Sequence, residues 1–307
     1  MPTSISKVSL RALALDLAWS LWAELGVSGW TRRHRNVALD LEPLIIATAY
    51  LGALDSRLLE ESFDWCVTNA RFISAVRLKN LLPSFELPVK KAFGSFAAAV
   101  KKHRSVSWPG DGKPLRVLRT GRSTIPDLHR PALVQLRLRA VFGVSARAEI
   151  VKRMLPEPDR PFGVSELAMY TAYGKDNLSD ALDLLSLAGF VSRNVMTKAG
   201  NVYVFQSSAA GRLSALLGEL PARDGYPYWA ARFRVLLALI YFAEGASTDA
   251  AVRAAEIQRF TGQMKLDLRW LTTYPRLRRG VDAVNEDFDK WAFGLLRRWA
   301  GTTVDGD

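Results

Sequence analysis

Apolar residues recur every three or four positions along most of the chain, a spacing that places them on one face of a helix. In the first 105 residues this spacing predicts five helices, each opened by a residue that caps or begins helices. The expected starting residues are Ser6 or Ser9, Asp40, Asp55, Ser74 and Pro88. The fifth helix, which runs to about residue 102, combines an apolar face with a face that carries two pairs of lysines: Lys90, Lys91, Lys101 and Lys102.

The pattern changes in the middle of the chain. The sequence predicts a helix from Ser145 to about residue 155, a short helix capped by Ser165, a turn at 173–174 and a longer helix over Lys175–Ala188. Gly189 follows that helix and suits a left-handed residue at its end. Two strands are then expected, over Phe190–Val195 and Asn201–Gln206, with the turn between them at 198–200.

Helical spacing returns near Tyr228 and continues to the end of the chain. The last predicted helix, Val281–Ala300, carries an apolar seam formed by Val281, Val284, Phe288, Trp291 and Leu295. A seam of this kind has two interpretations: the helix packs on its own domain, or it forms the interface of a two-fold homodimer.

The order helix, short helix, turn, helix and hairpin resembles a winged helix-turn-helix. The segments FGVSARAEIVKRML and VSELAMYTAYGKDNLSDALDLLSLAGFV, with the hairpin after them, look like the DNA-binding domains of bacterial regulators of the ArsR and MarR types. The resemblance covers about residues 139–206. It implies that Lys175–Ala188 enters the major groove of DNA and that the hairpin, the wing, touches the backbone or the minor groove.

The resemblance also assigns residues by position. The implied recognition-helix residues are Lys175, Asp176, Asn177, Ser179, Asp180 and Asp183. The implied wing residues are Arg193, Asn194, Lys198 and Asn201, and the first helix adds the phosphate-contact candidates Arg147, Lys152 and Arg153. One lysine against three aspartates departs from the usual pattern, because phosphates repel carboxylates.

The net charge of +12 is concentrated in one part of the chain. Residues 71–122 hold 12 Lys and Arg against two acidic residues, whereas residues 130–206 hold 10 against seven. Clustered positive charge favours binding of a polyanion. The phosphate-contact candidates of this basic window are Lys90, Lys91, Lys101, Lys102, Arg104, Lys113, Arg116, Arg119 and Arg122. If the fold brings these residues beside the wing, they supply the positive charge for phosphate contacts that the recognition helix lacks.

These elements divide the chain into four parts and predict a mainly α fold. An N-terminal helical domain (1–105) is followed by a basic connector (106–129) with one short strand at 115–118. The winged helix-turn-helix (130–206) comes next, and a C-terminal helical region (207–307) completes the chain.

The remaining composition narrows the class of protein. At 49% apolar and 23% charged residues the chain is an ordinary packed protein. Its single cysteine, Cys66, excludes an intramolecular disulfide and fits a reducing compartment. No apolar run is long enough to cross a membrane and no signal peptide is apparent, so we expect a cytoplasmic protein without a membrane partner.

Catalytic and cofactor signatures are missing from the sequence. The phosphate-binding and dinucleotide-binding glycine motifs do not occur, nor do the serine-hydrolase and zinc-protease motifs. The histidines His34, His103 and His129 and one cysteine are too few for a typical zinc site. His34 lies in a basic stretch and is expected at the surface. We therefore expect no enzyme, no cofactor and no metal.

The sequence as a whole indicates a DNA-binding protein that regulates transcription, with double-stranded DNA as its partner. Two alternatives stay open. In the first, the winged helix contacts a protein, as in an antitoxin-like or accessory module. In the second, the basic window binds RNA or single strands and the winged helix has only a structural role.

Overall fold

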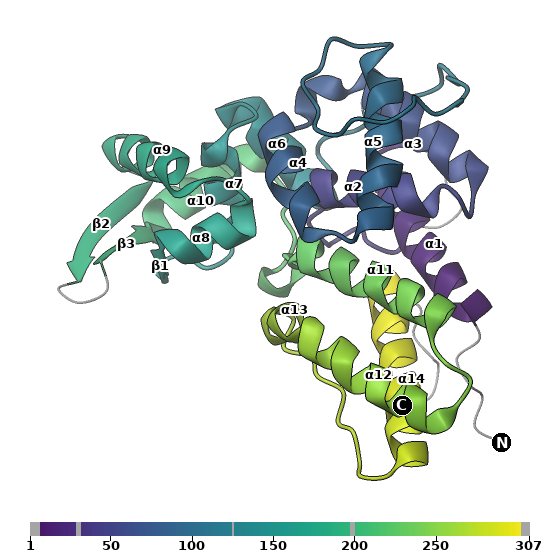
Figure 1. The fold of residues 1–307 in the computed structure, drawn as a ribbon. Coiled ribbons are helices and arrows are strands. Elements are labelled where there is room, and N and C mark those ends of the chain that lie inside the picture. Colours follow the sequence, from purple (N-terminus) through teal and green to yellow (C-terminus); the bar gives the residue numbers. More distant parts are fainter. Residues whose placement is uncertain (1–6, 29–31, 125, 197–199, 302–307) are drawn as a thin grey trace.

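The computed structural model describes residues 7–28, 32–124, 126–196 and 200–301. These residues form a mainly helical protein with fourteen α-helices and one small antiparallel sheet, as the periodicity predicted (Figure 1). Among the helices of the described chain, none combines the length and the apolar character needed to cross a bilayer.

Residues 7–133 and 228–301 share one hydrophobic core, and together we call them the larger half. Its helices are α1 (Lys7–Glu24), α2 (Leu41–Leu51), α3 (Ser56–Thr68), α4 (Ala75–Leu81), α5 (Leu87–Lys101), α11 (Trp229–Gly245), α12 (Ala250–Gln263), α13 (Lys265–Trp270) and α14 (Val281–Ala300). The predicted division assigned 1–105 and 207–307 to separate regions. They merge because α11 is apolar on nearly every side and is enclosed by helices from both.

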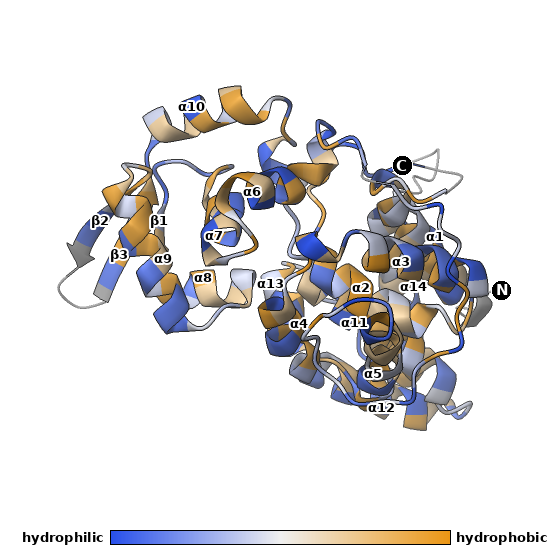
Figure 2. Cartoon of the chain, turned by 90° about the horizontal axis from the view of Figure 1, so that it is seen from above, coloured by the Kyte–Doolittle hydropathy of each residue, from blue (hydrophilic) through white to orange (hydrophobic). Residues whose placement is uncertain are grey.

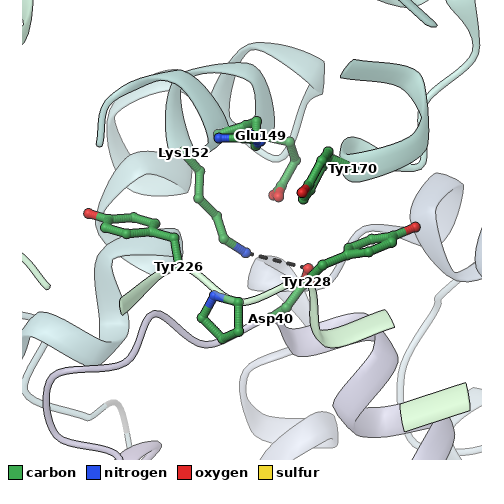
Figure 3. Close-up of a pocket in the computed structure, with 8 residues that line it drawn as sticks. Asp40, Glu149, Lys152, Tyr170, Tyr226 and Tyr228 are labelled. Carbon is green, nitrogen blue, oxygen red and sulfur yellow. Dashed lines mark ion pairs between the residues drawn. The ribbon is translucent and has the colours of Figure 1, made fainter. Parts of the chain in front are cut away.

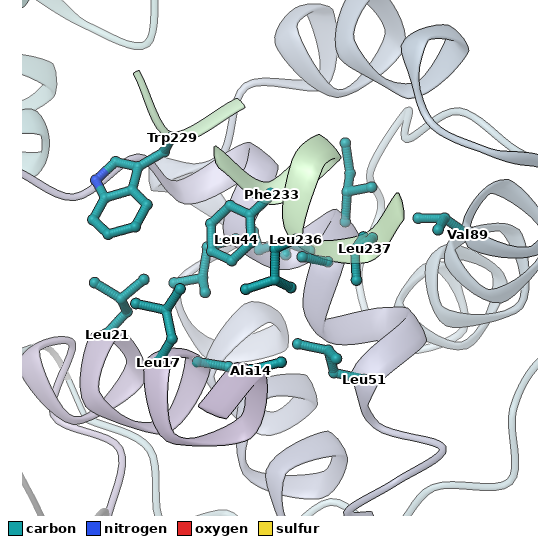
Figure 4. Packing of buried hydrophobic residues seen from close by; sticks show 14 of the residues in the cluster. Ala14, Leu17, Leu21, Leu44, Leu51, Val89, Trp229, Phe233, Leu236 and Leu237 are labelled. Carbon is teal, nitrogen blue, oxygen red and sulfur yellow. The ribbon is translucent and has the colours of Figure 1, made fainter. Parts of the chain in front are cut away.

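The centre of this core shows the merger directly. Leu17 of α1 and Leu44 of α2 meet Phe233 and Leu236 of α11, and all four side chains are buried (Figure 4). The indole of Trp229, at the start of α11, donates a hydrogen bond of 2.7 Å to the carbonyl oxygen of Ala38. Packing of this kind depends on contacts between residues about 200 positions apart.

The smaller half, residues 134–217, has a core of its own. Its elements are α6 (Val134–Phe142), α7 (Ala146–Met154), β1 (Pro161–Gly163), α8 (Val164–Thr171), α9 (Lys175–Leu187), β2 (Val191–Met196), β3 (Gly200–Phe205) and α10 (Ser207–Leu217). Helix α10 belongs to this core through Ala209 and Leu213. The predicted boundary between 206 and 207 therefore cuts through the smaller half.

The sheet joins three antiparallel strands in the order β1-β3-β2. Strands β2 and β3 match the predicted hairpin within one residue, whereas the predicted turn falls largely on 197–199, outside the described residues. Strand β1 was not predicted, because three residues that begin with a proline give no alternating pattern. It pairs with β3 through Phe162 opposite Tyr203.

Several residues predicted to cap or end a helix do so in the structure, and two do not. The Asp55 side chain accepts hydrogen bonds from the backbone N–H groups of Arg57 and Leu58, and Gly189 has a φ of +72° after α9. Ser145 and Ser165 do not cap: the Ser145 hydroxyl donates to a carbonyl oxygen of α6, and α8 begins before Ser165.

The connector 106–129 lies against α3 and α5 of the larger half. The predicted strand at 115–118 does not form, although the backbone N–H of Leu115 donates to the carbonyl oxygen of Ser95 in α5 (3.2 Å). The buried carboxylate of Asp64 in α3 accepts hydrogen bonds from the backbone of Gly121 (3.0 Å) and Ser123 (2.9 Å). Burial alone would raise the pKa of Asp64, but these donors outweigh it and lower the pKa.

The apolar seam of α14 faces the interior of its own chain. Val284, Phe288 and Leu295 are buried in the core of the larger half, and the half-buried Trp291 donates its indole N–H to the hydroxyl of Thr273 (3.2 Å). Val281, at the start of the seam, is exposed (42%), so the rest of the seam is the part that packs inside its own chain. Of the two interpretations of this helix, packing on its own domain is the one that the structure supports.

His34 is buried, with only 5% of its surface exposed, so its expected surface position is wrong. One ring nitrogen lies 2.8 Å from the hydroxyl of Ser20 in α1, and the other lies 2.8 Å from the carbonyl oxygen of Trp299 in α14. The ring thereby links the first helix to the last. Burial, opposed by the bond to Trp299, lowers the pKa of His34 below 6.5.

This lowered pKa predicts a loss of stability in mild acid. The folded state holds the imidazole neutral, and the unfolded state protonates it below about pH 6.5, so the contribution of His34 is present above that pH and declines below it. The substitution His34→Gln keeps a neutral polar group and removes the titration. We expect the free energy of unfolding in urea to fall less between pH 7.5 and pH 5.0 in this variant than in the parent; an equal fall would contradict the assignment.

Candidate nucleic-acid interface and the ion network behind it

Six charged side chains meet between the two halves, and every one is largely buried. The larger half supplies Asp40 and Glu42 at the start of α2 and Arg77 in α4. The smaller half supplies one residue of α6 and two of α7: Arg139, Glu149 and Lys152. Three carboxylates thus face three cations. We call this set the ion network.

Arg139 is the residue that ties both halves together most directly. Its guanidinium donates to both carboxylate oxygens of Glu42, at 2.7 and 2.9 Å, and to one oxygen of Glu149, at 2.5 and 2.8 Å. A further N–H donates to the carbonyl oxygen of Phe72 (2.6 Å). A guanidinium that is fully paired in this way repays much of the free-energy penalty of its burial.

Arg77 connects the network to the start of α9. It donates to both oxygens of Asp40 (2.6 and 2.8 Å) and also bonds Glu42, while its Nε donates to the carbonyl oxygen of Thr171 at the end of α8 (2.8 Å). Two further contacts fix the same turn. In the first, the Tyr173 hydroxyl lies 3.0 Å from the hydroxyl of Ser74. In the second, the Asn80 amide donates a 2.9 Å hydrogen bond to the carbonyl oxygen of Ala172.

The turn between α8 and α9 is therefore docked on α4. Ala172 has a φ of +56° in this turn, a backbone conformation that is uncommon for a residue other than glycine. Arg77 and Asn80 of α4 bind the carbonyl oxygens of Thr171 and Ala172 in this turn. The ion network and these neighbouring contacts therefore set the orientation of α9 relative to the larger half.

The pKa values of the network residues follow from this pairing. Burial would raise the pKa of Asp40 and of Glu149, but the guanidinium groups of Arg77 and Arg139 outweigh it and hold both pKa values below their usual range. Burial lowers the pKa of Lys152, which lies 3.5 Å from the carboxylate of Asp40 (Figure 3). Gln135 completes the set by donating its amide N–H to Asp40 and Glu149.

Beside Lys152 lies a cavity of about 30 Å³, lined by Tyr170, Tyr226 and Tyr228 (Figure 3). That volume holds a water molecule, whereas a site for a small substrate needs hundreds of Å³. Within the described chain, no group of His, Cys, Asp and Glu side chains is arranged to hold a metal ion.

One local feature of the sequence indicates the network. Glu42 stands alone among apolar residues in LEPLII, and a charged residue inside an apolar helix is a candidate for a buried ion pair. The partners lie 35 and 97 positions away, at Arg77 and Arg139, and no local pattern connects them.

The predicted recognition residues occupy the exposed side of α9. Lys175, Asp176, Asn177, Asp180 and Asp183 are exposed, and Ser179 is half-buried with its hydroxyl donating to the carbonyl oxygen of Lys175. In the hairpin, the wing candidates Arg193 and Asn194 are exposed and Asn201 is half-buried, whereas Lys198 lies outside the described residues.

The two candidates of α7 next to the network are not free at the surface. Lys152 is part of the ion network. Arg153 binds the carboxylate of Glu157 (2.6 Å) and lies over the ring of Tyr170, 4.4 Å from its centre. Arg147 is exposed. Of the three, only Arg147 presents its charge to solvent.

Seven candidates of the basic window are exposed on α5, directly after it, or on the connector, all in the larger half. We call them the cationic face: Lys91, Lys101, Lys102, Arg104, Lys113, Arg116 and Arg122. Within the part of the chain that the structure describes, none of these seven has a carboxylate partner. Lys90 is half-buried, and Arg119 pairs with Asp64 (3.2 Å).

The cationic face does not lie beside the hairpin. The hairpin projects from the far end of the smaller half, while α5 and the largely hydrophilic connector belong to the larger half (Figures 1 and 2). The expected addition of these cations to the wing is therefore not found. Helix α9 and the connector do share the upper side of the molecule in Figure 1.

No model of a known protein family matches this chain, and neither does a curated protein or a solved structure.

The network makes a clear prediction for stability. Arg139→Met leaves the carboxylates of Glu42 and Glu149 buried without their main partner, so we expect a loss of about 3–5 kcal/mol in the free energy of unfolding. Lys290→Met, which breaks the exposed pair with Glu286, is the control and should change little.

A second substitution separates charge from packing. Because the loss comes from unpaired carboxylates, adding Glu42→Gln to Arg139→Met should restore part of it. A loss below 1 kcal/mol for Arg139→Met, measured by urea denaturation, would contradict the role given to the network.

Proposed function

We propose that this chain is a DNA-binding protein that regulates transcription by occupying double-stranded DNA. The observation that carries the proposal is the cationic face, seven exposed cations without carboxylate partners in the described chain. Such a surface attracts phosphate backbones and releases their counterions.

The smaller half supports the proposal through its topology. In chain order α7, β1, α8 and α9 precede the β2–β3 hairpin, and β3 lies between β1 and β2 in the sheet. This is the arrangement expected of a winged helix-turn-helix, in which α8 and α9 form the helix pair and β2–β3 the wing. Fold alone does not establish a ligand, so the proposal depends on the surface residues.

We assign base contacts to the first turn of α9. In helix-turn-helix proteins the N-terminal residues of the second helix reach the base edges. Here Lys175 and Asn177 are exposed, and an asparagine side chain can bond adenine through two hydrogen bonds. Arg193 and Asn194 of the hairpin, with Lys198, would touch the backbone. Asp180 and Asp183 lie further along α9 and are left out, because phosphates repel them.

The cationic face supplies most of the affinity in this proposal. Because α9 and the connector lie on the same upper side in Figure 1, one extended duplex is the ligand that both would contact. Arg147 adds a cation from the smaller half. Affinity would then come mainly from the larger half and sequence preference from the smaller half.

The first test reverses charge on the cationic face. Lys101→Glu with Lys102→Glu should weaken binding to every duplex sequence, and Lys265→Glu with Arg269→Glu, an equal change on α13, is the matched control. If six phosphate contacts form, affinity for random duplex DNA should fall about 10³-fold between 50 and 200 mM salt, measured by fluorescence anisotropy.

Two outcomes of that titration would overturn the proposal. One is the absence of duplex binding at 50 mM salt. The other is a preference for single-stranded DNA or RNA of the same length, which would favour a single-strand-binding role for the cationic face.

A second test concerns sequence preference. Asn177→Ala removes a side chain that we assign to base contact, so sequences selected from a random duplex pool should lose specificity at one position, at a cost of about 1–3 kcal/mol there. Affinity for random DNA should stay close to that of the parent. An unchanged selected sequence would exclude the first turn of α9 from readout.

A further inference from the structure

The last turns of α9 expose an apolar surface. Leu187 has 86% of its surface exposed and Leu184 has 51%, and the two are neighbours on the helix at a spacing of three. The ring of Phe190, which follows α9, meets the ring of Phe142 edge-on, with 5.7 Å between centres. Large aliphatic side chains exposed side by side on one helix face mark a candidate interaction site.

Carboxylates border the leucines on the same side of the helix. Asp180 precedes Leu184 by four residues, and Asp183 precedes Leu187 by four, so each carboxylate lies one turn before a leucine. Both aspartates are exposed, and neither has an ion-pair partner within the described part of the chain. We call Asp180, Asp183, Leu184 and Leu187 the acidic-apolar face.

The chemistry of this face selects its occupant. Phosphates repel the two aspartates, which disfavours a nucleic acid at this end of α9. A second copy of α9 is also unsuitable: in a parallel pair the aspartates would face aspartates, and in an antiparallel pair they would be desolvated against leucines. A helix with apolar side chains one turn apart and Lys or Arg beside them satisfies both the leucines and the carboxylates.

We infer that the acidic-apolar face of α9 binds a basic amphipathic helix of another protein. The proposed partner contact uses the last turns of α9, whereas the proposed DNA contacts use its first turn and the cationic face. A regulator built in this way presents one part of the smaller half to DNA and another to a protein partner.

The test uses two labelled 18-residue peptides with the same leucine positions. In the first peptide all surface positions that are not leucine are lysine. In the second peptide the same positions are glutamate. The protein has a net charge of +12, which disfavours a lysine-rich peptide everywhere except at a local acidic surface. Fluorescence anisotropy at 150 mM salt should show binding of the lysine peptide and none of the glutamate peptide.

Paired variants locate the site. Leu184→Ser with Leu187→Ser, and separately Asp180→Asn with Asp183→Asn, should each weaken binding of the lysine peptide at least about tenfold, which is 1.4 kcal/mol or more. Leu118→Ser with Leu266→Ser removes two equally exposed leucines of the larger half and is the control. All these side chains are exposed, so the variants should keep the parent's thermal stability.

Several results would overturn the inference. They are no binding of the lysine peptide, equal binding of both peptides, or unchanged binding to the variants. Self-association of the parent that the leucine variant abolishes, seen by sedimentation velocity, would assign the face to a second copy. Loss of duplex binding in the leucine variant would assign it to DNA, whereas failure of duplex binding in the parent affects only the proposed function.

Discussion

The structure depends on a balanced set of buried charges between its two halves. A carboxylate or guanidinium that loses its partner in such a place carries a penalty of several kcal/mol, so the six charges are stable only when all are assembled. Asp40 and Glu42 come from one core, and Arg139 and Glu149 from the other. Each half therefore needs the other in one orientation, and apolar packing alone, which is not directional, would not impose it.

This constraint reaches the surfaces to which we assign function. Arg77 holds the carbonyl oxygen of Thr171, and that turn sets the direction of α9. The buried carboxylate of Asp64 holds the connector against α3 and α5, which fixes the cationic face. The two surfaces thus belong to one rigid arrangement in which affinity and readout are supplied by different halves.

Local features of the sequence predicted the helices well, because a helix is determined by neighbours within a few positions. The bounds of α14 were correct, as was the cap at Asp55, and the bounds of α9 were correct to one residue. The burial of His34 against Trp299 and the pairing of Glu42 with Arg139 were not predictable, because they join residues 265 and 97 positions apart. The same distance dependence explains why charge counted along the chain located the cationic face but not its separation from the hairpin.

The ion network fixes the smaller half relative to the larger one. The most direct test of this constraint is the distance between spin labels placed at Lys91→Cys in α5 and Asn194→Cys in the hairpin, measured by pulsed electron paramagnetic resonance. The native thiol of Cys66 is buried, and burial raises its pKa, so labelling is confined to the new cysteines. We expect one narrow distance distribution, which broadens when Arg139→Met is added. A broad distribution without that substitution, or a narrow one that Arg139→Met leaves unchanged, would contradict the claim.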